Sequence, residues 1–381
     1  MDIKNTVVEL TSALVQQASV SPDSTEAQQI IERRLKKIGF NTQQKNFSGR
    51  NNLWALVGDS GPIFCFSGHT DVVPAGNEAA WDYPAFAGTI VGDYLYGRGT
   101  EDMKANIAAM IVAVENFIAK SGVPKKFRIA FLISGDEEHD HALGTEAILS
   151  WLKAQQIKID YCINGEPTSE KTLGDIIKIG RRGAIQGLIK VLGQQGHSAH
   201  PQRADNAITK ALPALLELSQ LTFDDGNDFF QPTGLQITSI QSGAGASNVI
   251  PGELTARLNC RFSPGLKAEE IKAKIENIFK KYQLSNHLEW VVSAEPFLTK
   301  PGFLADLVAS SIKTELGVST SYSCAGGTSD ARFIAKHGVE VIEFGLHNET
   351  LHQVNERVSI SELEALTKVY LRILLDLAAR L

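Results

Sequence analysis

Short apolar runs alternate with longer amphipathic stretches over roughly the first half of this chain. Four runs predict strands, because they are rich in β-branched and aromatic residues and end at polar or glycine positions: 53–57, 63–66, 128–133 and 161–163. Helical spacing of apolar residues predicts helices near 103–120 and 143–156, and an earlier one between Ser24 and Gly39. Strands that alternate with helices are typical of an α/β domain with a mostly parallel central sheet.

The order of the predicted elements changes near Gly180. From there the chain predicts a strand, a helix, two strands, a helix and a strand: 182–193, 205–220, 233–242, 253–262, 267–283 and 287–293. This β-α-β-β-α-β order is typical of a ferredoxin-like fold. We therefore predict an α/β domain formed by residues 1–179 and 294–381, with a second domain, residues 180–293, inserted into it.

Composition narrows the class of protein. With 43% hydrophobic and 21% charged residues the chain is typical of a globular protein, and a net charge of −6 argues against a nucleic-acid partner. The four cysteines are far apart and form no C-x-x-C pair, so we expect neither disulfides nor a thiolate zinc site. This use of cysteine fits a protein of the reducing cytoplasm. The start of the chain lacks signal-peptide features, and the apolar stretch 105–119 is too short and too polar to span a membrane.

Five polar clusters follow the apolar runs, at positions where α/β sheets gather their ligand sites. They are residues 68–71, 99–102, 135–138, 164–167 and 347–352. Together they supply imidazoles and an excess of carboxylates, with no cysteine. This nitrogen and oxygen donor set suits a pair of divalent metal ions, so a two-metal hydrolase is the first hypothesis.

Each cluster, taken alone, has a simpler explanation. His69 and Asp71 would share one face of a strand, as a metal ligand and the residue that orients it, but an isolated pair favours a turn in which Asp71 caps backbone amides. Asp102 could bridge two cations or be an ordinary N-cap, and its neighbour Glu101 is expected to face solvent.

The paired carboxylates Glu137 and Glu138 repel each other unless a cation or a proton compensates them. One of them could bind metal while the other takes a proton from water, or both could lie in a solvated acidic turn. His139 and His141 beside them are expected at the surface. Glu166 and His352, each unremarkable alone, complete the series.

The whole chain resembles the M20 family of metallopeptidases, and within it the desuccinylase branch. The motifs that carry the family resemblance are Ser67-Gly68-His69-Thr70-Asp71, Trp81-x-x-Pro84-x-Phe86, Gly97-Arg98-Gly99-x-x-Asp102-Met103-Lys104, Asp136-Glu137-Glu138, Gly165-Glu166-Pro167, Gly196-His197 and Asn248-Val249-Ile250-Pro251. Those that carry the branch resemblance are Gly180-Arg181-Arg182-Gly183, Gly326-Gly327-Thr328-Ser329-Asp330 and His352-x-Val354-Asn355-Glu356.

The resemblance implies a zinc-peptidase-like catalytic domain, two zinc ions per subunit with cobalt as a possible substitute, and a role for each cluster. Asp102 would bridge the ions, with His69 and Glu166 on one and Glu138 and His352 on the other. Glu137 would be the general base, and Asp71 would steer His69.

The resemblance also implies a small-molecule substrate held by a set of polar side chains: Lys178, Arg181, Asn248, Arg261, Thr328 and Asn348. Guanidinium groups suit carboxylates because they donate two parallel hydrogen bonds, although Arg181 could instead be a solvated charge. Two positions, His200 and Ser247, depart from the family pattern, where we expect tyrosine and asparagine.

The insert would be a lid and dimerisation domain, and His197 would complete the active site of the partner subunit in a homodimer. Without the resemblance, His197 would be a surface histidine in a glycine-rich turn.

The expected reaction is hydrolysis of the succinyl amide of N-succinyl-L,L-2,6-diaminopimelate. Another M20-type deacylase, such as an acetylornithine deacetylase, or an aminopeptidase is the nearest alternative. A non-catalytic binding scaffold is disfavoured, because every position expected of a ligand or base is filled.

Overall fold

The computed structural model describes residues 2–139, 143–243, 245–284 and 287–381, and His141 lies outside this range. The chain divides into two compact units. The first contains the residues up to Ile179 together with Thr299–Ser323 and Ser329–Leu381, and the second contains Gly180–Leu298 and Cys324–Thr328. The second unit thus continues past residue 293, where the sequence pattern put its end, because β16 (Phe297–Leu298) pairs with β9 (Gly180–Arg181).

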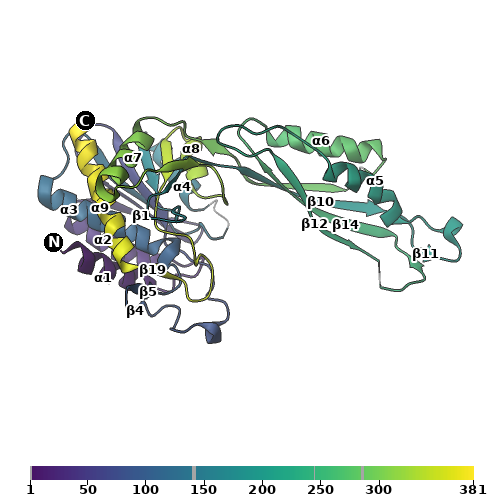
Figure 1. Ribbon diagram of the computed structural model, residues 1–381, viewed down its shortest axis with the longest axis horizontal. Helices are drawn as coiled ribbons and strands as arrows, with labels where there is room; N and C mark the ends of the chain where they lie inside the picture. The colour runs from purple at the N-terminus through teal and green to yellow at the C-terminus, as the bar shows by residue number, and fades with distance from the viewer. Residues whose placement is uncertain (1, 140–142, 244, 285–286) are drawn as a thin grey trace. The chain divides into compact units, whose positions relative to one another are not determined.

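An eight-stranded sheet forms the centre of the first unit (Figure 1). Its order is β1 (Asn41–Phe47), β2 (Arg50–Val57), β6 (Arg128–Ser134), β3 (Ile63–His69), β7 (Tyr161–Asn164), β18 (Glu340–Glu343), β8 (Ile176–Lys178) and β17 (Ser321–Ser323). The central pairings, from β6 through β3 and β7 to β18, are all parallel. All seven residues of β3 are buried, as expected for a parallel strand covered on both faces.

Two groups of helices pack on this sheet. One group consists of α1 (Ile3–Val15), α3 (Ala105–Ser121), α7 (Phe303–Leu316) and α9 (Ile360–Arg380), with α2 (Thr25–Lys37) beside α3. The other is the pair α4 (Thr145–Ala154) and α8 (Ala331–Lys336). A small antiparallel sheet of β4 (Thr89–Val91), β5 (Tyr94–Tyr96) and β19 (Arg357–Ser359) completes the unit. Within the described residues, no helix is long and apolar enough to cross a membrane.

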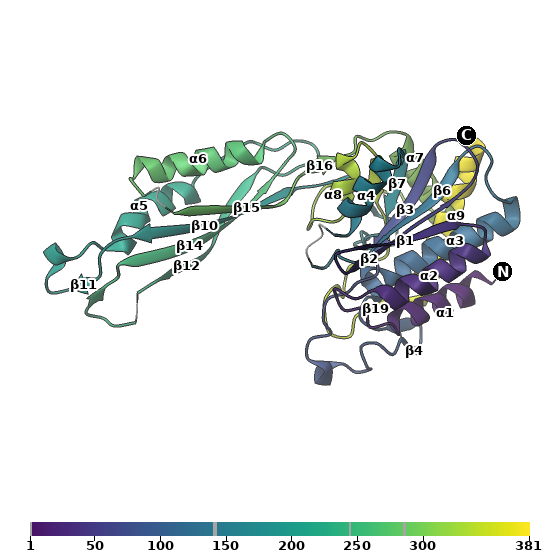
Figure 2. The same ribbon diagram turned by 180° about the vertical axis from the view of Figure 1, so that it is seen from behind.

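The second unit has the predicted ferredoxin-like arrangement. Its antiparallel sheet has the order β12 (Gly234–Ser242), β14 (Glu253–Phe262), β10 (Gly183–Leu192) and β15 (Leu288–Ala294). Both α5 (Ala207–Ser219) and α6 (Ala268–Lys281) lie on one face of this sheet (Figure 2). Alternate residues of β14 are buried under them, which is the pattern of a sheet with one covered face. The short strands β11 (Gly196–His197) and β13 (Val249–Ile250) pair beyond the main sheet.

Candidate active site

The carboxyl ends of three neighbouring parallel strands gather the first candidate residues. His69 is the last residue of β3 and lies opposite Ser134, the last residue of β6. On the other side of β3, Ser67 lies opposite Asn164 at the end of β7. The segments that follow β6 and β7, with Glu138 and Glu166, therefore leave the sheet beside His69.

Asp102 lies between two imidazoles. Its Oδ1 is 3.0 Å from Nε2 of His69, and its Oδ2 is 3.2 Å from Nε2 of His352. Nε2 of His352 is also 3.0 Å from Oε1 of Glu138, and Nε2 of His69 is 3.9 Å from Oε1 of Glu166. The structure thus brings all five predicted metal ligands into one cluster.

The donor atoms form two overlapping groups that share Asp102. One group is His69, Asp102 and Glu166, and the other is Asp102, Glu138 and His352; within each group the donor atoms lie within 4.8 Å of one another. These are the two sets that the family resemblance implies. A third grouping joins His69 to Glu137 and Glu138. Nitrogen and carboxylate donors at this spacing are suited to divalent metal ions.

Some of the charged groups in this cluster are buried and others are not: His69, Asp102 and Glu137 are buried, whereas His352 is exposed. Burial opposes ionisation of Asp102, but its hydrogen bonds with His352 and His69 lower the pKa of its carboxyl below the usual range. Hydrogen bonds to Asp102 and Glu138 raise the pKa of His352 to about 10. Burial raises the pKa of the Glu137 carboxyl well above its usual value. Buried carboxylates at this density need a compensating positive charge, and a metal ion can supply it.

Asp71 serves both of the roles that the sequence left open. Its carboxylate accepts hydrogen bonds from the backbone amides of Glu137 (3.2 Å) and Glu138 (3.0 Å). Its backbone oxygen is 2.9 Å from Nδ1 of His69, while its Oδ1 is 3.7 Å from the same nitrogen. Asp71 therefore fixes the turn that carries the paired glutamates and also orients the imidazole, chiefly through its backbone oxygen.

The prediction that Glu101 faces solvent is wrong. Glu101 is only 2% exposed, and its Oε2 accepts hydrogen bonds from the backbone amide (2.8 Å) and the hydroxyl (2.9 Å) of Thr350. Burial raises the pKa of its carboxyl to about 7. The prediction failed because Glu101 is held inside the protein by Thr350, a partner 249 residues further along the chain, which no local sequence pattern could reveal.

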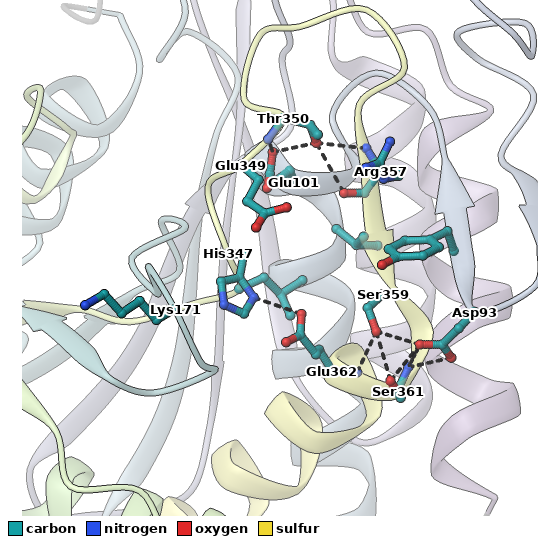
Figure 3. Close-up of a pocket in the computed structure, with 13 residues that line it drawn as sticks. Asp93, Glu101, Lys171, His347, Glu349, Thr350, Arg357, Ser359, Ser361 and Glu362 are labelled. Atoms are coloured by element: carbon teal, nitrogen blue, oxygen red, sulfur yellow. Dashed lines mark hydrogen bonds and ion pairs between the residues drawn. The ribbon is translucent and has the colours of Figure 1, made fainter.

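A pocket of about 420 Å³ lies next to this contact, lined by residues such as Glu101, His347 and Thr350 (Figure 3). His347 and Glu362 point toward each other there, with Nδ1 and Oε2 2.9 Å apart. None of the five candidate metal ligands lines this pocket, so it is separate from the ligand cluster.

The predicted substrate residues are divided between the two units. In the first unit, Lys178 ends β8 and is 4% exposed, with its Nζ 3.3 Å from Oγ of Ser323. Asn348 is exposed, in the segment between β18 and His352. In the second unit, Arg181 is buried rather than solvated and donates to the backbone oxygen of Ala325 (3.3 Å).

Three further candidates of the second unit lie on β14 or in loops. Arg261, on β14, donates from Nε to Oδ1 of Asn259 (3.1 Å), Thr328 is half-buried and Asn248 is exposed. His197 is exposed as well, and its Nδ1 accepts a hydrogen bond from the amide of Ala199 (3.0 Å). In the first unit, His139 is exposed, in agreement with the surface position expected for it.

Three buried polar residues at the cluster received no role from the sequence: Glu356, Asn106 and Asp330. Glu356 and Asp330 belong to motifs of the family pattern, which was the only available signal. Glu356 accepts a hydrogen bond from the backbone amide of Asp102 (3.2 Å), and Asn106 is the second residue of α3, which begins at Ala105. Asp330, 4% exposed, accepts a hydrogen bond from Thr145 (2.7 Å).

The fold and the ligand cluster define a metal-dependent hydrolase. Residues 65–376 match the family described as Peptidase family M20/M25/M40, and the chain belongs to this family. It is similar to succinyl-diaminopimelate desuccinylase of Pseudoalteromonas translucida (strain TAC 125), with 45% identity over 98% of this chain and 99% of that protein. It is equally similar to the protein of the same name from Acinetobacter baumannii (strain ACICU), with 46% identity over 97% of this chain and 98% of that protein.

Solved structures share the fold at lower identity. Aminopeptidase PepT from Bacillus cereus superposes with a TM-score of 0.80 and 20% identity, over 98% of this chain and 99% of that one. The M20 family metallo-carboxypeptidase Sso-CP2 from Sulfolobus solfataricus gives 0.78 and 15%, over the full length of both chains. The resemblance to the M20 family and the predicted fold class are therefore confirmed.

Proposed function

We propose that this chain hydrolyses N-succinyl-L,L-2,6-diaminopimelate to succinate and L,L-diaminopimelate, a step of lysine and cell-wall precursor synthesis. The observation that carries the reaction class is the pair of ligand groups that share Asp102. We infer the identity of the substrate from the names of the two relatives given above, which align with nearly the whole chain at 45% and 46% identity.

Two zinc ions, or cobalt in their place, are the cofactors of the proposal. His69, Asp102 and Glu166 would hold one ion, and Asp102, Glu138 and His352 the other; each carboxylate oxygen of Asp102 already faces a different histidine. The two ions would supply Lewis-acid polarisation of the scissile carbonyl and stabilise the negative charge that develops on its oxygen.

Glu137 is the proposed general base. It takes a proton from the attacking water and then passes that proton to the leaving amine, so that a neutral amine departs. Burial raises the pKa of its carboxyl, and the two nearby cations would oppose that rise and keep the side chain ionised, as a general base must be. The hydrogen bonds from the amides of Glu137 and Glu138 to Asp71 hold the base next to a metal ligand.

The substrate carries carboxylates at both ends, and the proposed binding residues match this charge. Lys178, Arg181 and Arg261 would pair with carboxylates, while Asn248, Thr328 and Asn348 would hydrogen-bond the carboxylate or amide groups. A buried arginine such as Arg181 supports the proposal, since an arginine that merely solvates a surface would be exposed.

A homodimer is the proposed assembly, with a second copy of this chain bound through the inserted unit. β12 is an edge strand of its sheet, and Ile240 on it is 54% exposed. Leu212 and Leu216 are also exposed, on the neighbouring helix α5. An edge strand beside exposed leucines supports pairing with an identical surface.

The four cysteines are buried free thiols, which supports the proposal of a reducing compartment.

Release of succinate from the proposed substrate, with and without a chelator, tests this function. We expect release that stops in chelator and returns when zinc is added. N-acetylornithine and dipeptides, assayed in parallel, should be poor substrates because they lack a succinyl group and its free carboxylate. Faster hydrolysis of either would move the chain to another activity of the same family. Succinate release that persists after all metal has been removed would contradict the metal-dependent mechanism.

A further inference from the structure

The two proposed metal sites differ in how their ligands are held in place. His69 ends β3 and Glu166 follows β7, and these two strands pair directly in the buried sheet. His352 instead lies in the segment between β18 and β19. Its φ is +59°, in the left-handed region of backbone conformation that residues other than glycine rarely adopt. The sheet therefore does not place His352, and other contacts must bring it to Asp102.

Glu356 supplies the first of these contacts. Its side chain is fully buried, and its carboxylate accepts four hydrogen bonds from the segment that carries Asp102. The donors are the guanidinium of Arg98 (2.7 Å) and the backbone amides of Gly99 (2.9 Å), Glu101 (2.8 Å) and Asp102 (3.2 Å). Arg98 also donates to the backbone oxygen of His352 (3.3 Å).

Two more buried side chains run in the opposite direction, from the Asp102 segment to the His352 segment. Glu101 accepts from the amide and the hydroxyl of Thr350, two residues before His352. Asn106 accepts from the backbone amide of Leu346 (2.9 Å) and donates to the backbone oxygen of Glu101 (3.1 Å). The two segments are thus tied together in both directions.

We infer that Glu356, Glu101 and Asn106 form a clamp that positions His352 against Asp102 and thereby sets the affinity of the metal site that His352 and Glu138 complete. The inference rests on the proposed two-metal function. These three are positioning residues, since each acts through backbone groups of the two segments. Because the sheet holds His69 and Glu166 independently, loosening the clamp should affect the two metals unequally.

The test compares zinc retention in wild type and in Glu356→Gln. Both are loaded with zinc and dialysed against graded chelator, and the bound zinc per chain is measured. Wild type should hold two zinc ions. The variant should lose one of them at about ten- to a hundredfold lower chelator activity, the usual effect of removing a residue that supports a ligand, while the other is retained as in wild type. Glu356→Asp, which keeps the charge, should recover part of the loss.

Glu115→Gln is the matched control. Glu115 is also a buried carboxylate of the first unit, paired with Arg34 through two hydrogen bonds (2.7 and 2.6 Å), but it contacts neither segment of the clamp. This change should lower the melting temperature without altering the retention of either zinc. Equal loss of both zinc ions from Glu356→Gln would overturn the inference, because it would indicate general unfolding around the site.

A milder variant covers the case in which Glu356→Gln does not fold. Thr350→Val removes the hydroxyl donor to Glu101 and keeps the shape of the side chain, so we expect a severalfold weaker retention of one zinc. Wild-type retention in every variant that folds, including Thr350→Val alone where Glu356→Gln does not fold, would overturn the clamp. A wild-type protein that holds no zinc would instead contradict the proposed function, so the two failures are distinguishable.

Discussion

Glu137 and Glu138 are adjacent in sequence, yet the structure gives them different surroundings. Oε1 of Glu138 lies 3.0 Å from Nε2 of His352 in a ligand group with Asp102, whereas Glu137 is only 9% exposed and its pKa is raised chiefly by that burial. We predict that Glu137→Ala lowers kcat by about a hundred- to ten-thousandfold, the usual contribution of a general base. Both metal ions should remain bound, because Glu137 is not needed as a ligand.

The measurement is kcat together with zinc content. Glu138→Ala is the comparison: it should lose zinc as well as activity. A Glu137→Ala protein with near-wild-type kcat would assign the base to another residue, and one that has lost its metal would make Glu137 a ligand.

Arg261 tests the substrate contacts at the same scale. A lysine in its place keeps the positive charge and loses the planar pair of donors, so we predict a fall in kcat/KM of about tenfold. Arg257 lies four residues earlier on the same face of β14, where side chains alternate, and Arg257→Lys should leave kcat/KM unchanged. An unchanged kcat/KM in Arg261→Lys would make Arg261 a structural residue, held by Asn259.

The same scale shows what the sequence could not predict. Composition and cluster position indicated a metal site made of imidazoles and carboxylates. The choice of His69, Asp102, Glu138, Glu166 and His352 as its ligands came from the resemblance to the M20 family. The burial of Glu101 and the contacts of Glu356 were not predictable, because each depends on a partner about 250 residues away. A carboxylate that accepts backbone amides has no sequence signature that separates it from a surface glutamate.

At the scale of elements, buried strands were predicted well and polar ones were missed. β3, β6 and β7 begin where the apolar runs that predicted them begin and end within three residues of them, and the six main elements of the inserted unit appear in the predicted order. β1 (Asn41–Phe47) was not expected, since its sequence is polar almost throughout. It is an edge strand held by seven paired positions of β2 rather than by burial of its own side chains.

The segment that carries His352 is also fixed to helix α9, through His347 and Glu362 (Figure 3). The hydrogen bond to Glu362 raises the pKa of His347 above its ordinary value of 6.5. A raised histidine pKa stabilises the fold fully at pH values below 6.5, and the contribution is lost as the pH rises through the raised value. We predict that His347→Gln lowers the free energy of unfolding by about 0.2–1 kcal/mol at low pH and has a smaller effect at high pH.

Urea unfolding of the metal-free proteins between about pH 5.5 and about pH 9 measures this difference. The Glu362→Gln background provides the control: the effect of His347→Gln should then change less with pH, because the main partner that raises the pKa of His347 is gone. A difference that grows with rising pH would have the wrong sign and would contradict the assignment.

At the scale of the whole molecule, the ligand cluster lies within one unit while the proposed substrate residues belong to both. Every candidate metal ligand and Glu137 belong to the first unit. Arg181, Arg261 and His197 belong to the inserted one. The insertion itself was predictable from the change of pattern at Gly180. Its end at Leu298 was not, because β16 is only two residues long and pairs with a strand of the same length.

The last prediction concerns His197, which the resemblance to the M20 family assigns to the active site of the partner subunit. His197 is exposed at the end of the short strand β11, and its Nδ1 is engaged by the amide of Ala199, which leaves Nε2 as the nitrogen that can carry a proton. An imidazole N–H can donate a hydrogen bond to the oxyanion that forms during amide hydrolysis. His197→Ala should therefore lower kcat strongly without loss of zinc.

Mixing two inactive variants separates action across the interface from action within one chain. In a mixture of His197→Ala and Glu137→Ala, about half of the dimers are mixed, and each would have one intact site, so about a quarter of the wild-type activity should return. His200→Ala, at a neighbouring ring 5.9 Å from His197, is the control and should stay active on its own. If subunit exchange is demonstrated and no activity returns, His197 acts within its own chain or only supports the structure of the insert.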